Sequence, residues 1–319
     1  MNPGFSRRTF LSTSALALAA AGAPVLAQYA RASETSGAPH LKFPDSARER
    51  LAVASWPFRA YINAPGNADR DQSLPGMDLR EFPAWVKKHF NVTAIEPLSD
   101  HFSSTEHSYV AAFRESLEKA GMRVVNIPVD NELSYYDVEA SVRQKVVDNG
   151  KRWVDAAQTL GSPSVRTSIA QAKNATPDVD IVAAELRQLA DYAAEKDIVV
   201  NLENDNLISE DAFFVVKVIG KANHPYLHAL PDFCNSMQTG NEKFNTDALT
   251  QLFSHAYNIC HVKDSESSED HKVVRVDLKK IFAILKASSY RGYLSMEWEG
   301  QGPPIEGTNK LIDASLEYL

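Results

Sequence analysis

The stretch Ile198-Val199-Val200-Asn201-Leu202-Glu203 decides the fold, because a short run rich in β-branched residues predicts a buried strand. A longer amphipathic pattern, which predicts a helix, follows this run. The same alternation recurs in both directions along the chain. The expected strands lie at residues 51–55, 92–96, 123–127, 164–167, 198–203, 227–232, 258–262 and 293–297. The expected helices lie at residues 79–89, 106–120, 138–160, 178–195, 209–220, 246–254, 277–288 and 306–318.

Repeated strand–helix units are typical of a parallel sheet whose crossover connections are helices. Eight such units close naturally into a barrel, so we predict an α/β fold with a single (β/α)8 barrel over residues 51–319. An open, doubly wound sheet is the alternative. It is disfavoured because no glycine-rich dinucleotide or phosphate loop follows the first expected strand.

Composition excludes several classes of protein. The 319 residues are 44% hydrophobic and 23% charged, which rules out disordered, collagen-like and coiled-coil chains. The formal net charge of −8 disfavours nucleic acid or an acidic membrane surface as the main partner. Two cysteines, Cys234 and Cys260, cannot form a disulfide framework, and we expect both to be buried thiols.

The N-terminus reads as an export signal. A twin-arginine pattern, Ser6-Arg7-Arg8-Thr9-Phe10-Leu11, precedes an alanine-rich apolar segment over residues 15–23. We predict a Tat signal peptide over residues 1–32, cleaved after Ala27 or Ala32, and a linker over residues 33–50. The alternatives are an uncleaved anchor and a chance pair of arginines. Residues 1–32 hold three arginines and no acid, so cleavage changes the formal charge from −8 to −11. The mature protein is then periplasmic or extracellular, with no membrane attachment.

Four residues at the ends of consecutive expected strands carry chemistry: Glu203, Asp232, His261 and Glu297. They are separated by 29, 29 and 36 residues, about one strand–helix unit each. Active sites of such barrels lie at the C-terminal ends of the strands, so all four should point into one mouth. Three carboxylates in one mouth repel one another unless a cation neutralises them. Three oxygens and one imidazole nitrogen suit a divalent ion such as Mn²⁺, Mg²⁺, Co²⁺ or Zn²⁺.

The chain resembles the xylose isomerase-like TIM barrel superfamily, and within it the sugar phosphate isomerase/epimerase group. The resemblance covers roughly residues 51–300 and rests on Glu203-Asn204, Asp232-x-x-Asn235, His261-Val262-Lys263-Asp264 and Gly292-Tyr293…Glu297. It implies that Glu203, Asp232, His261 and Glu297 bind one divalent metal ion, with Mn²⁺ favoured. It also implies that Glu203 and Glu297 are the catalytic acid/base pair, and that Asn235 contacts the substrate or orients a ligand.

Two departures from the family leave the substrate open: Asp205 replaces an aromatic residue or histidine, and residues 265–272 lack a glycine-rich stretch. We expect an isomerase or epimerase that moves a proton through an enediolate of a small-molecule sugar or polyol ketone. A lyase or dehydratase acting on a keto-sugar or keto-inositol is the alternative. The rivals outside that chemistry are a metal-free glycosidase and a non-enzymatic, exported sugar-binding barrel. Some relatives cleave DNA, but the anionic surface disfavours that activity for this chain. Relatives often form homo-oligomers.

Further polar groups near strand ends are candidates for binding substrate. Glu96 ends the second strand and either binds a substrate hydroxyl or is a rim charge. Arg166 and Lys263 either hold an anionic group or a sugar hydroxyl, or pair with the surplus carboxylates. Arg275, in the loop after the seventh strand, is a further candidate. Trp56 follows the first strand and either stacks on a sugar or belongs to the core.

Overall fold

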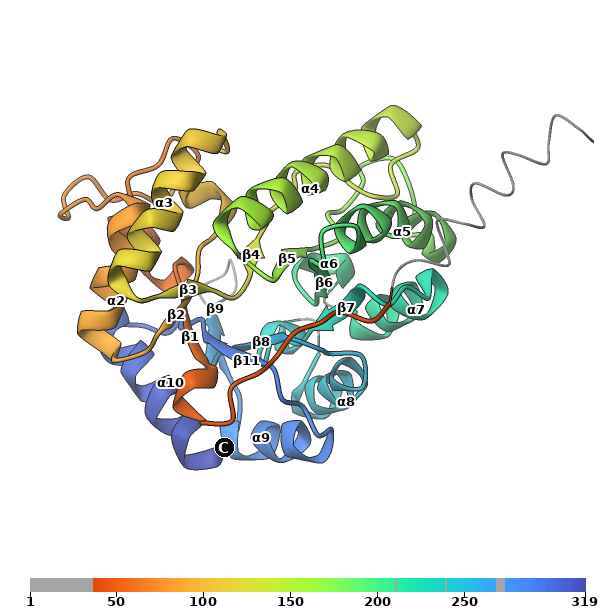
Figure 1. Ribbon diagram of the computed structural model, residues 1–319. Coiled ribbons are helices and arrows are strands. Elements are labelled where there is room, and N and C mark those ends of the chain that lie inside the picture. The colour runs from red at the N-terminus through yellow and green to blue at the C-terminus, as the bar shows by residue number, and fades with distance from the viewer. Residues whose placement is uncertain (1–36, 210, 239, 268–272) are drawn as a thin grey trace, which may run out of the picture. The chain divides into compact units, whose positions relative to one another are not determined.

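Eight strand positions form a ring of parallel strands, and helices surround that ring (Figure 1). The structure is a computed structural model that describes residues 37–209, 211–238, 240–267 and 273–319. The predicted signal peptide over residues 1–32 lies outside the described residues. Residues Pro39–Leu319 form one compact unit. Within the described ranges, no helix is both long and apolar enough to cross a membrane.

The ring consists of two hydrogen-bonded parallel sheets, with strand orders β3-β2-β1-β11-β8 and β4-β5-β6-β7. Two short segments, β3 and β4, follow each other along the chain, and β3 pairs with β2 whereas β4 pairs with β5. On the opposite side, parallel bridges Ala229↔Ala256 and Asp232↔His261 join the sheets. The predicted single barrel is therefore confirmed. The strands are β1 (Leu51–Ala54), β2 (Ala94–Glu96), β3 (Arg123–Val124), β4 (Ile127–Pro128), β5 (Ser164–Thr167), β6 (Val199–Glu203), β7 (Leu227–Leu230), β8 (Ile259–Val262) and β11 (Tyr293–Met296).

A helix follows each strand position, as predicted. Glycines in the left-handed conformation end two of them, Gly121 after α3 (φ 63°) and Gly161 after α4 (φ 83°), because glycine adopts positive φ without steric cost. The expected helix over 79–89 begins with a 3-10 turn, η3 (Leu79–Glu81), which Asp78 caps. The helices are α2 (Phe82–Phe90), α3 (His107–Ala120), α4 (Ala140–Leu160), α5 (Val179–Ala194), α6 (Asn206–Ser209), α7 (Ala212–Ala222), α8 (Glu242–Phe253), α9 (Leu278–Ala287) and α10 (Pro304–Tyr318).

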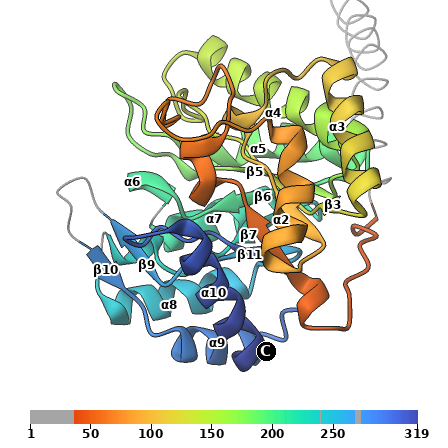
Figure 2. The ribbon, with the colours of Figure 1, turned by 90° about the vertical axis from the view of Figure 1, so that its left-hand side faces the viewer.

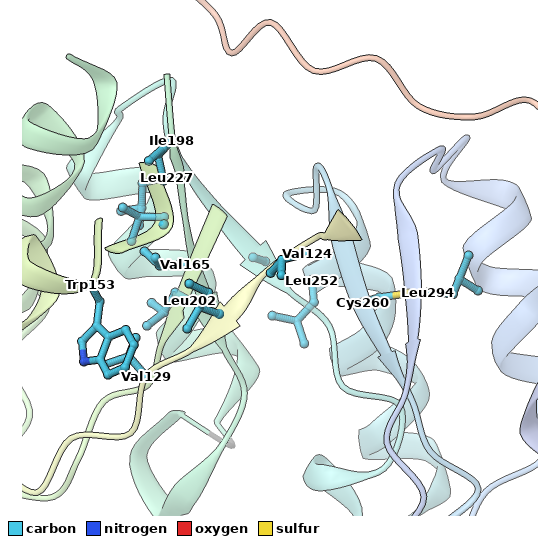
Figure 3. Packing of buried hydrophobic residues seen from close by; sticks show 14 of the residues in the cluster. Val124, Val129, Trp153, Val165, Ile198, Leu202, Leu227, Leu252, Cys260 and Leu294 are labelled. Carbon is cyan, nitrogen blue, oxygen red and sulfur yellow. The ribbon is translucent and has the colours of Figure 1, made fainter. Parts of the chain in front are cut away.

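Alternation along the strands separates an apolar outer layer from the barrel interior. In β6, Val200 and Leu202 belong to the main hydrophobic cluster, whereas Asn201 and Glu203 alternate with them and are buried polar residues. Cys260 of β8 and Leu294 of β11 pair in register and lie side by side in that cluster (Figure 3). The predicted burial of both cysteines as free thiols is confirmed.

The N-terminal segment 39–50 packs against the barrel, although the sequence predicted residues 33–50 to be a linker. Phe43 lies edge-on to Tyr257 and Tyr293, with ring centroids 5.5 and 6.1 Å apart. It packs against a small apolar cluster that includes Tyr293 and Ile259. Arg50 is buried and donates to the carbonyl oxygen of Gly292 at 3.0 Å. This segment therefore belongs to the folded unit.

A short antiparallel hairpin that the sequence did not predict follows the seventh strand position (Figure 2). It consists of β9 (Ser265–Ser267) and β10 (Val273–Arg275). Because β9 begins three residues after β8 ends, the hairpin places its first residues close to the mouth of the barrel.

Candidate active site

The four predicted ligand residues converge at the C-terminal mouth of the barrel. Glu203 ends β6, Asp232 follows β7, His261 lies in β8 and Glu297 follows β11. One ligand atom from each lies within 4.8 Å of the others, and all four side chains are buried. The regular strand–helix spacing thus gives the convergence that the sequence predicted.

His261 is held between carboxylates on both sides of its ring. Its Nδ1 lies 2.8 Å from Glu203 Oε1 and 3.2 Å from Glu297 Oε2. Its Nε2 lies 3.0 Å from Glu96 Oε1, which also accepts a hydrogen bond from Asn126 at 2.7 Å. Burial lowers the pKa of His261, but these three carboxylates outweigh burial and raise it well above its usual value. The ring is thereby oriented with Nδ1 toward the two catalytic candidates.

Asp232 presents one oxygen that no hydrogen bond satisfies. Its Oδ1 accepts from the backbone N–H groups of Cys234 (2.8 Å) and Asn235 (2.6 Å). Its Oδ2 is buried and has no hydrogen-bond partner. Burial raises the pKa of Asp232 to about 6, although Lys263 opposes this shift. This oxygen lies 3.6 Å from Lys263 Nζ, and together with the two other carboxylates and the imidazole it forms a donor set that fits a divalent cation.

Two buried cations pair with the carboxylates. Arg166 Nε lies 2.6 Å from Glu203 Oε2, and its Nη1 lies 2.6 Å from Asp130 Oδ1. Lys263 Nζ lies 3.1 Å from Glu297 Oε2 and 2.9 Å from Glu299 Oε1. The structure thus shows the pairing with surplus carboxylates that the sequence left as one of two alternatives.

These cations also set the charge state of the acid/base candidates. Burial raises the pKa of Glu203, but Arg166 and His261 lower it more, so the net shift is downward. Burial raises the pKa of Glu297 as well, but His261 and Lys263 lower it below its usual value. Lys263 itself is buried, and the carboxylates around it raise its pKa well above the usual value despite burial.

A cavity of about 250 Å³ opens at this mouth, and Trp56 and Asn235 line it. Asn235 Oδ1 also accepts a hydrogen bond from Lys263 Nζ at 3.1 Å. The structure does not bring Arg275 to the cavity: this residue is exposed on β10 and lies outside the lining. The charged residues of the lining are Glu96, Asp130, Arg166, Glu203, Asp205, Lys263, Glu266, Glu297 and Glu299.

Three of these lining residues were missed by sequence reasoning. Glu299 lies two residues after Glu297, a spacing that could have placed it on the same side of the strand end. Glu266 comes from the unpredicted hairpin, 2.9 Å from Lys263 Nζ, and burial raises its pKa to about 8. Asp130 follows β4 and had no signal beyond its position near a strand end.

The fold and the buried carboxylate–imidazole group define a class, (β/α)8 barrels whose mouth carries residues that could hold a metal ion. Comparison with known protein families matches residues 83–319 to the xylose isomerase-like TIM barrel family. That match covers most of the chain, which therefore belongs to this family. No match was found among curated protein sequences.

Three solved structures illustrate the range of similar proteins. D-allulose 3-epimerase from Methylomonas sp., in complex with D-allulose, is 15% identical over 88% of this chain and 99% of that chain, with a TM-score of 0.66. A xylose isomerase-like TIM barrel protein from Mycobacterium smegmatis, in complex with magnesium, is 17% identical over 84% and 97%, with a TM-score of 0.60. A probable 3-DHS dehydratase of petrobactin synthesis from Bacillus anthracis is 15% identical over 82% and 97%, with a TM-score of 0.61. At these identities the likeness shows the fold alone.

Proposed function

We propose that the protein is a metal-dependent isomerase or epimerase of a sugar or sugar-like ketone. One observation carries this proposal: two buried carboxylates, Glu203 and Glu297, converge on the same nitrogen of His261 and line one small cavity. The similarity in fold to an epimerase that binds D-allulose supports it.

The residues that would hold the metal are Glu203, Asp232, His261 and Glu297, and the Oδ2 of Asp232, which accepts no hydrogen bond, fits this role. When bound, a divalent ion would polarise the adjacent oxygens of a hydroxy ketone and so make the neighbouring C–H bond more acidic. We favour Mn²⁺. The magnesium complex of a similar barrel supports a divalent ion of this kind.

The side chains around the cavity have distinct proposed roles in proton transfer and in positioning. In each turnover, one of Glu203 and Glu297 is ionised and takes a proton from the substrate carbon, and the other begins protonated and gives its proton to the opposite face. Arg166 and Lys263 hold these two side chains in position, through contacts of 2.6 Å to Glu203 and 3.1 Å to Glu297. Glu96 orients His261 through Nε2, and Asn235 is placed to contact a substrate hydroxyl. Return of the proton to the opposite face gives epimerisation, and return to the adjacent carbon gives isomerisation.

Elemental analysis of the purified protein, combined with incubation of a panel of ketoses and keto-sugars in D₂O, tests this function. About one divalent ion per chain and deuterium on the substrate carbon are expected. Glu297→Gln should abolish the exchange, whereas Glu115→Gln, at an exposed position on α3, should leave it unchanged. Wild-type exchange in Glu297→Gln would exclude its acid/base role. Loss of water from the substrate would instead identify a dehydratase.

We also propose that the protein is exported by the Tat pathway, on the support of the twin-arginine stretch around Arg7 and Arg8. N-terminal sequencing of the exported protein should begin at Gln28 or at Ser33. Replacing both arginines by lysine should retain the protein in the cytoplasm. Export of that variant at the wild-type level would overturn this proposal.

A further inference from the structure

A second cavity, of about 400 Å³, adjoins the mouth of the barrel. It lies between the segment that follows β1, which includes η2 (Trp56–Tyr61), and the connection from β11 to α10. Glu299 lines both this cavity and the active-site cavity. Of two residues adjacent in sequence, Trp56 lines the active-site cavity and Pro57 lines the second cavity. Both cavities therefore border the side chain of Glu299.

The walls of this second cavity include two half-buried aromatic side chains, Tyr61 and Trp298. The indole of Trp298 packs closely against two glycines. A Cβ atom at Gly307 would lie 2.1 Å from the indole, and one at Gly300 would lie 2.8 Å from it. Only glycine permits this approach, so the backbone of α10 and its preceding loop fixes the position of the ring.

Hydrogen bonds and ion pairs hold the polar side chains near Glu299 in place. Glu299 Oε1 accepts hydrogen bonds from Trp56 Nε1 at 2.6 Å and from Lys263 Nζ at 2.9 Å. Arg59 lies over the Trp56 ring at 4.1 Å and forms an ion pair with Asp69 at 3.7 Å. The lining of the second cavity thus combines aromatic side chains with carboxylates and a guanidinium, the kinds of group that contact the C–H and O–H surfaces of a sugar ring.

We propose that this second cavity binds the second ring of a glycosylated ketone, so that the substrate is a two-ring keto-disaccharide rather than a free monosaccharide. This inference rests on the proposed function. The active-site cavity of about 250 Å³ is smaller than most ligand pockets, which span about 300–1,000 Å³, and suits a single sugar ring. A substituent on that ring leaves past Glu299 and enters the aromatic-walled space.

The test compares fructose with four ketose-terminated disaccharides that differ in linkage: lactulose, maltulose, turanose and isomaltulose. The readout is deuterium exchange by the metal-loaded protein, expressed as kcat/KM for each substrate. We expect at least one disaccharide to exceed fructose by about tenfold, the size of one favourable aromatic contact. Tyr61→Ala should reduce this preference ratio toward one.

Two further variants separate binding from folding. Trp298→Phe keeps an aromatic ring and should reduce the ratio partially, whereas Tyr192→Ala, on the outer helix α5, should preserve the ratio. Equal kcat/KM for fructose and all four disaccharides would overturn the second-ring subsite and leave the proposed function standing. So would a Tyr61→Ala variant that retains the full preference ratio. Exchange into no member of the panel would contradict the proposed function itself.

Discussion

Replacing Glu96 tests whether the ring of His261 is held in place for a metal ion. Glu96 is fully buried, and its Oε1 lies 3.0 Å from His261 Nε2. Histidines that bind a metal commonly donate their other ring N–H to a carboxylate, which fixes the ring and increases its basicity. We therefore expect substitution of Glu96 to weaken metal binding although Glu96 lies outside the proposed ligand set.

Two substitutions of Glu96 should weaken metal binding by different amounts. Glu96→Gln keeps an oxygen that can face His261 and Asn126, but it removes the negative charge. The new side-chain NH2 group takes the place of Oε2, which has no hydrogen-bond partner, and so needs an acceptor there. Glu96→Ala removes the contact entirely. Loss of such partners weakens metal affinity by about 10- to 100-fold, so we assign about tenfold to glutamine and about 100-fold to alanine. These losses correspond to about 1.4 and 2.7 kcal/mol.

Competition for Mn²⁺ against a fluorescent chelator measures these affinities directly. Thermal unfolding of each metal-free variant shows whether the fold persists, and Glu115→Gln is the matched surface control. The reasoning fails if Glu96→Ala remains folded and binds Mn²⁺ within about twofold of the wild type, well below the loss expected for such a partner.

Three further results are expected. His101 is fully buried, and burial, aided by Arg59, lowers its pKa from 6.5 to about 3. The unfolded state therefore binds a proton that the native state does not, so native stability should fall by roughly 2 kcal/mol between pH 7 and pH 5. Urea unfolding of His101→Gln should show a smaller loss, and an identical pH dependence would contradict the assignment. Phe43→Ala should lower the free energy of unfolding by about 2 kcal/mol, because Phe43 is only partly buried and a fully buried phenylalanine loses ~3–5 kcal/mol on the same substitution. An unchanged urea midpoint would place Phe43 outside the core. His261→Ala should lose stoichiometric metal in elemental analysis, and full occupancy would remove His261 from the ligand set.

The strand–helix order was predictable because most strands are short runs rich in apolar or β-branched residues and each is followed by a longer amphipathic stretch. Helix starts were less accurate. The helix predicted at 246 begins at Glu242, where the Asn241 side chain accepts from the backbone N–H of Phe244. Segment 39–50 and the β9–β10 hairpin were missed for a common reason. Their sequences are mostly polar, and a single aromatic such as Phe43 does not reveal which surface it will contact.

The four candidate metal ligands were predictable because equivalent strand ends of a barrel face one mouth. Their partners were not, since the pairing of Arg166 with Glu203 depends on how two neighbouring strands are staggered. Arg275 illustrates the limit. Its position in the loop after the seventh strand is compatible with the mouth, but its strand β10 leaves it exposed.

The arrangement of charges bears on which proton transfer we propose for the site. Each acid/base candidate has a cation of its own: Arg166 lies against Glu203, and Lys263 lies against Glu297. An elimination needs one group that takes a proton and a second that already holds one to give to the leaving group. A reversible epimerisation needs the same two states in each turnover, but the two groups must exchange them when the direction reverses. Two buried carboxylates that face the same imidazole, each with its own cation, have matched surroundings and so can exchange the roles of base and proton donor. This symmetry is why we place reversible proton transfer ahead of dehydration.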